Sequence, residues 1–101
     1  MRHLGTLRGK GVIESSGHSL GDATFELDGY LVHPTQIVAS GEVHMDAAEL
    51  SNAFGRTDLV LSTSKGLRLS IRFSGKMLAP KAVVAHIDVR DGLPPAKTWK
   101  R

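Results

Sequence analysis

Apolar and polar residues alternate along most of this chain with a period of two, the pattern of β-strands with one buried face. Between positions 67 and 73 every odd residue is apolar, and every even residue is Arg or Ser. Similar runs predict five more strands, at about 5–14, 23–32, 36–44, 59–61 and 82–89. The intervening Ser64-Lys65-Gly66 predicts a hairpin between 59–61 and 67–73. The expected fold is therefore mainly β.

The facing of each strand follows from the same alternation. We expect the inward positions to be the following: Ala23, Phe25, Leu27, Ile37, Ala39, Gly41, Val43, Leu67, Leu69, Ile71, Phe73, Val83, Ala85, Ile87 and Val89. Glycines within these runs favour tight strand bends or close backbone approach over nucleotide binding. The glycines concerned are Gly9, Gly11 and Gly41.

One short helix is expected near residues 46–54. Asp46 and Glu49 have the spacing of a capping box, and Gly55 supplies a C-terminal stop. Such a helix often covers the open end of a small barrel. We therefore predict a small six-stranded antiparallel β-barrel or barrel-like sheet with one capping helix, and an open sheet against the helix is the alternative. Residues 1–91 form the predicted domain, and residues 92–101 form a Pro-containing basic C-terminal arm.

Composition excludes several classes of protein. The 101 residues include no cysteine, which removes disulfides, thiolate metal sites and a cysteine nucleophile. The N-terminus lacks the apolar core of a signal peptide, and no run approaches the roughly 18 apolar residues of a membrane span. We expect a cytoplasmic protein that has no membrane partner.

Catalytic and metal-binding motifs find little support. Gly17-His18-Ser19-Leu20-Gly21 matches G-x-S-x-G, but a strand is predicted to follow it where a nucleophile elbow needs a helix. The loop Ser15–Asp22 is therefore interpreted as a turn, although a site in it is left open. The five histidines show no metal-ligand spacing. We predict no catalytic residue, no metal and no cofactor, and lean against an enzyme.

Charge is distributed unevenly along the chain. Residues 15–50 hold six carboxylates and no Lys or Arg, whereas residues 51–101 hold ten basic residues and three acidic ones. The simplest interpretation is pairing of opposite charges across strands or between copies. The alternative is a basic face that attracts nucleic acid, with Trp99 as a stacking platform or packed back onto the domain. The residues of that tentative face are Arg8, Lys10, Arg68, Arg72, Lys97, Trp99, Lys100 and Arg101.

The function favoured by these patterns is contact without chemistry. Small size, the lack of a catalytic constellation and the separated charges favour a non-enzymatic binding or protein-interaction module that associates with a protein partner or with its own copy. A nucleic-acid-binding small β-barrel is the alternative, and a small-ligand-binding barrel or an enzyme is a remote one.

Overall fold

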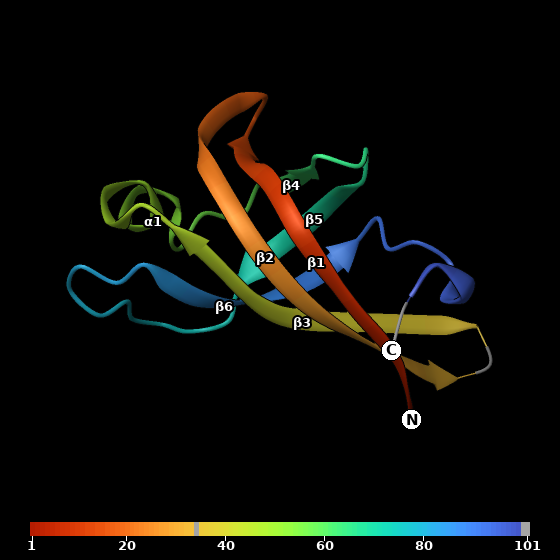
Figure 1. Cartoon of the computed structure of the whole chain (residues 1–101). Helices are drawn as coiled ribbons and strands as arrows, with labels where there is room; N and C mark the ends of the chain where they lie inside the picture. Colours follow the sequence, from red (N-terminus) through yellow and green to blue (C-terminus); the bar gives the residue numbers. More distant parts are fainter. Residues whose placement is uncertain (34, 100–101) are drawn as a thin grey trace.

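The computed structural model describes residues 1–33 and 35–99, which form one antiparallel sheet of six strands with one short α-helix. The sheet closes in a ring in the order β1-β2-β3-β6-β5-β4 (Figure 1). The strands are β1 (Arg2–Ser15), β2 (His18–His33), β3 (Gln36–Met45), β4 (Leu59–Thr63), β5 (Arg68–Phe73) and β6 (Val84–Asp91). Helix α1 (Ala47–Ala53) joins β3 to β4, and a 3-10 turn η1 (Ala96–Thr98) follows β6. The predicted mainly β fold is thus confirmed.

The β1–β2 hairpin is longer than its sequence pattern indicated. Ser16 and Gly17 have φ angles of 51° and 82°, and Ser15 pairs with His18 in the register of the two strands. Two consecutive positive φ angles are typical of the tight turns whose twist matches that of a hairpin. The connection between β1 and β2 is therefore the two residues Ser16 and Gly17, and not the longer loop predicted at 15–22. Ser19 lies inside β2 rather than on a strand-to-helix turn.

The ring interior is filled by the side chains that alternation assigned to the inner face. Leu27, Leu69 and Ile87 are fully buried, and Phe25 is 7% exposed. They belong to one core that includes Leu50 of α1, so the helix packs on the inside of the sheet at one end. Burying a side chain of this size stabilises a fold by about 1.5–3 kcal/mol.

Strand β6 begins later than predicted, and this changes one facing. Val83 precedes the strand and is 51% exposed, contrary to its expected inward position. The chain turns at residues 79–82, where the Ala82 N–H donates to the Ala79 carbonyl and Lys81 has a φ of 60°. This turn rotates Val83 out of the alternation, whereas Ala85 and Ile87 keep their buried positions.

Half of the expected capping box is present at the start of α1. The Asp46 carboxylate accepts hydrogen bonds from the backbone N–H groups of Ala48 and Glu49, at 3.2 and 3.3 Å. The Glu49 side chain lies against Gly21 of β2, where a Cβ atom would come within 2.5 Å of Glu49 Cδ. Glu49 therefore packs the helix on the hairpin. None of the helices in the described ranges is long and apolar enough to cross a membrane.

The C-terminal segment lies against the three strands that extend beyond the ring. Trp99 is 6% exposed and clusters with Leu4 of β1 and Ala39 of β3. Its ring occupies the space above Gly29, where a Cβ atom would lie only 2.7 Å from Cζ3. The described part of the predicted arm is thus ordered on the sheet. It covers a second, smaller apolar cluster.

Asp58 ties the tip of the hairpin to the start of β4, and this contact predicts a pH effect. Ser16 Oγ and Ser15 Oγ each donate to Asp58 Oδ2 at 2.7 Å, and these bonds hold the pKa of the carboxyl below its usual value. A lowered folded-state pKa stabilises the protein above the unfolded-state pKa of about 3.9, and the gain is lost as pH falls through the folded-state value. We expect Asp58→Asn to lower the melting temperature at pH 7, with the difference from the natural protein diminishing as pH falls below the unfolded-state pKa and through the folded-state one.

Thermal unfolding followed by circular dichroism at several pH values measures this difference. Glu42→Gln is the matched control, because Glu42 is exposed and no hydrogen bond or ion pair of its side chain is found within the described residues. A difference that stays constant from pH 7 to about pH 3 would contradict a role for the ionised carboxylate.

Candidate interaction site

Two of the predicted nucleic-acid-binding arginines are held in ion pairs. Arg8 Nε lies 2.7 Å from Glu26 Oε2, directly across the β1–β2 pair. Arg68 Nη2 lies 3.1 Å from Glu14 Oε1 on β1. Arg8 therefore pairs with a carboxylate on the neighbouring strand, as the simpler interpretation of the charge pattern expected, whereas Arg68 reaches Glu14 across the intervening strand β4.

The other residues of the tentative basic face are scattered. Arg72 lies opposite Asp88 in the β5–β6 register, and Lys97 is exposed on η1. Trp99 is buried, so it presents no free face on which a base could stack. Lys100 and Arg101 lie outside the described residues. The described members belong to β1, β5 and the C-terminal segment, and Arg8 and Lys10 of β1 line one small hollow together with Lys65.

A serine, a histidine and an aspartate meet at the end of β5, a grouping that the sequence pattern did not indicate. Ser74 Oγ lies 2.6 Å from His86 Nδ1 and donates to Asp88 Oδ2 at 2.9 Å. A hydroxyl has one hydrogen to donate. While the Ser74 O–H donates to Asp88, the Ser74 oxygen can only accept from His86, which requires the tautomer with a hydrogen on Nδ1. This is the reverse of a catalytic triad, in which the histidine accepts the serine proton and the acid orients the histidine. The cluster therefore ties β6 to the end of β5.

A second histidine, His3, has partners of its own on β2. His3 Nε2 lies 3.2 Å from Asp28 Oδ1, and its ring centroid is 5.1 Å from that of Tyr30. Within residues 1–33 and 35–99, no three His, Asp or Glu side chains are arranged to hold a metal ion.

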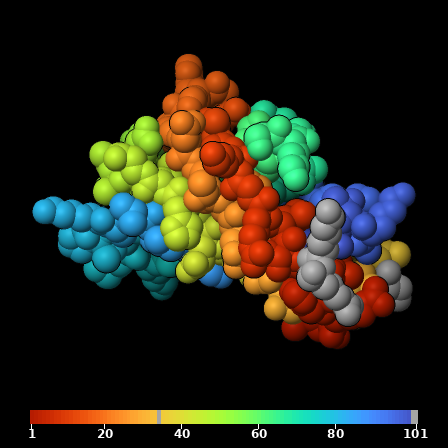
Figure 2. Space-filling model, viewed as in Figure 1, coloured from red at the N-terminus to blue at the C-terminus, as the bar shows by residue number. Residues whose placement is uncertain are grey.

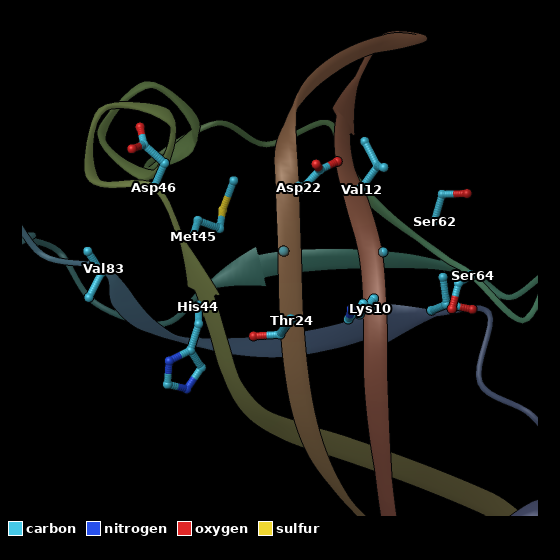
Figure 3. A pocket seen from close by; sticks show the side chains of 13 residues that line it. Lys10, Val12, Asp22, Thr24, His44, Met45, Asp46, Ser62, Ser64 and Val83 are labelled. Carbon is cyan, nitrogen blue, oxygen red and sulfur yellow. The ribbon is translucent and has the colours of Figure 1, made fainter.

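A groove of about 800 Å³ crosses the outer face of β4, β1, β2 and β3 (Figure 3), and we call it the outer groove. It is lined by Lys10, Gly11, Val12, Asp22, Ala23, Thr24, His44, Met45, Asp46, Ser62, Thr63, Ser64 and Val83. Its walls are paired strands, so its shape is held by the backbone ladder of the sheet.

The hollow forms where β1 bends toward β4. A Cβ atom on Gly11 would lie 2.5 Å from the Ser62 carbonyl oxygen, so the glycine permits the close approach of the two strands. The β1–β2 register also shifts between Ile13 and Glu14. Such irregularities increase the local twist of a strand pair and curve its surface.

The groove combines an apolar floor with charged side chains of both signs. Val12 and Val83 supply apolar surface, and Met45 lies between Val83 and the hairpin. Lys10 lies at the β4 side, where its carbonyl accepts from the Ser64 N–H at 2.8 Å. Asp22 and Asp46 lie at the α1 side, one residue beyond the Ala23–Met45 pair.

The charged groups that line the groove remain accessible. Lys10, Asp22 and Asp46 are all exposed, and no ion pair within residues 1–33 and 35–99 includes any of them. The end near α1 is therefore acidic.

Sequence reasoning did not find this groove. Alternation assigned Thr24 and His44 to polar faces and grouped Lys10 with Arg8, but their neighbours across β4 and β3 follow from strand pairing. Comparisons with protein-family models, curated proteins and solved structures find no match to this chain.

Proposed function

We propose that this protein is a small β-barrel that acts as a non-enzymatic protein-interaction module, with the outer groove as its contact surface. The observation that carries the proposal is the apolar floor of the groove, which exposed side chains of both charges accompany: Lys10, Asp22 and Asp46. Polypeptide segments carry apolar side chains and charges of both signs. An interface that combines apolar contact with complementary charge gains both affinity and orientation.

Other ligand classes fit the groove less well. A nucleic acid strand would bring phosphates toward Asp22 and Asp46, and two of the tentative basic residues are already in ion pairs. Small-molecule sites are usually enclosed and cover most of the ligand. The outer groove lies on the surface of the sheet, and the ring interior is filled by core side chains.

Site-specific photo-crosslinking tests the proposal. A photoreactive amino acid replaces Thr24 in the groove in one variant and Arg72 on the outer face of β5 in the matched control. After irradiation in extract of the source cells, we expect polypeptide adducts at position 24 at a yield about tenfold above position 72, as for a contact of micromolar affinity. Equal yields at both positions would contradict a polypeptide partner in the groove.

A further inference from the structure

The loop between β5 and β6, residues 74–83, exposes apolar side chains beside the outer groove. Met77 is 89% exposed and Val83 is 51% exposed, and they are two of the four exposed large hydrophobic residues in the described ranges. Loop residues project from the side of the molecule near α1 (Figures 1 and 2). An exposed methionine on a projecting loop is an adaptable contact that gains from burial.

The same loop is basic. Lys76 and Lys81 flank its apolar segment, and both are exposed. None of the ion pairs found within residues 1–33 and 35–99 involves either lysine. The loop therefore presents an apolar tip between two cations that are available to carboxylates of a partner.

The acidic end of the outer groove adjoins the base of this loop. The Met45 N–H donates to the Val83 carbonyl at 2.9 Å, which connects the floor of the groove to the end of the loop. Asp22 and Asp46 lie next to this contact, and both are exposed. The basic loop and the acidic groove thus form one continuous surface of this chain.

We propose that the outer groove binds the 74–83 loop of a second copy of this chain, so that two copies associate about a two-fold axis. A two-fold interface needs one patch that complements itself, and a loop next to the groove that receives it meets this condition. In the dimer, Met77 of each copy covers the apolar floor of the other, and Lys76 and Lys81 face Asp22 and Asp46. Lys10, which would repel the loop, lies on β1, and β2 separates it from Met45 and Asp46 at the base of the loop. This inference rests on the proposed function and specifies its partner.

A charge-swap experiment tests the pairing. The loop variant carries Lys76→Glu and Lys81→Glu, and the groove variant carries Asp22→Lys; Asp46 is kept because it caps α1. Each variant alone places like charges at both contacts of a two-fold dimer. We expect the dissociation constant of each to rise about tenfold, as measured by sedimentation velocity.

Mixing the two variants restores opposite charges at both contacts, so we expect the mixture to associate more tightly than either variant alone. Lys97→Glu on η1 is the control for net charge and should leave association unchanged. A mixture that associates no more tightly than its components would overturn the proposal. So would a natural protein that remains monomeric up to about 1 mM.

A second pair of variants tests the apolar contact. Met77→Ser and Val38→Ser each replace an exposed apolar side chain. Val38 is the control, because it lies on β3 and belongs neither to the 74–83 loop nor to the lining of the outer groove. Both variants should keep the melting temperature of the natural protein. We expect Met77→Ser to weaken dimerisation about tenfold and Val38→Ser to leave it unchanged. Equal effects of the two substitutions would contradict the assigned contact.

The oligomeric state also separates this inference from the proposed function. A monomer that crosslinks to another polypeptide through position 24 overturns the loop-in-groove dimer and supports the interaction module. A monomer without adducts at position 24 overturns both proposals. A dimer whose crosslink at position 24 maps to residues 74–83 supports both.

Discussion

Replacing Gly41 by alanine is expected to destabilise the protein by about 3 kcal/mol, which lowers the melting temperature by roughly 15 °C for a domain of this size. Gly41 lies directly opposite Leu27 in the β2–β3 register. A Cβ atom on it would overlap the Glu26 carbonyl oxygen and lie 2.9 Å from Leu27 Cα. These are backbone atoms of a neighbouring strand, so no side-chain rotation relieves the overlap. The two strands would have to separate beside the fully buried Leu27.

Gly9→Ala is the matched control for this effect, because Gly9 is also a strand glycine. Its Cβ atom would lie 3.4 Å from Phe25 Cζ, which is an ordinary contact with the end of a side chain. We expect the free energy of unfolding to change by less than about 1 kcal/mol. Alanine reduces the conformational freedom of the unfolded chain, and this stabilising effect offsets any small crowding in the folded state. Urea unfolding followed by circular dichroism measures both variants. Equal stability of Gly41→Ala and Gly9→Ala would show that β2 and β3 are not as close as described.

Replacing Trp99 by alanine is expected to destabilise the protein by about 3–5 kcal/mol. Its ring packs against Leu4 and Ala39 and covers Gly29, although it belongs to the last residues of the chain. Removing the indole leaves the second apolar cluster open to solvent on the side that the C-terminal segment covers. Urea unfolding measures the loss, and intrinsic fluorescence of the natural protein reports the transition because Trp99 is its single tryptophan.

Lys97→Ala is the control in the same segment, because Lys97 is exposed and its loss should change stability by less than about 0.5 kcal/mol. Gly29→Ala adds a second test, since its Cβ atom would displace the Trp99 ring. We expect Gly29→Ala to be destabilising in the natural protein and close to neutral in the Trp99→Ala background. Additive effects would contradict direct contact between the two positions.

Much of the fold was predictable because it depends on local patterns. Alternation at 67–73 identified Leu69 and Ile71 as inner residues, and both are buried in the core. The turn at Ser64–Gly66 and the helix after Asp46 also lie where local signals put them. Val83 departs from its prediction because the turn at 79–82 intervenes, and periodicity alone carries no information about such a turn.

The candidate site was much less predictable. Lys10 and Thr24 belong to predicted strands, but alternation alone does not say that β4 and β3 flank the hairpin that carries them. Trp99 illustrates the same difficulty, since its place in the chain was compatible with stacking on a base as well as with the favoured packing on the domain or on a second subunit. Burial decides between them, and burial is a property of the folded structure.

The sequence by itself determined the six strands and the facing of most of their side chains. Side-chain direction alternates from one residue to the next, so a local pattern is sufficient to assign it. Only the tertiary structure decided that β4 closes the ring on β1, that Trp99 covers Gly29, and that the 74–83 loop lies beside an acidic groove. These features depend on contacts between residues that are distant in the sequence. The sheet selects one set of such contacts through the burial and backbone hydrogen bonding of the whole chain.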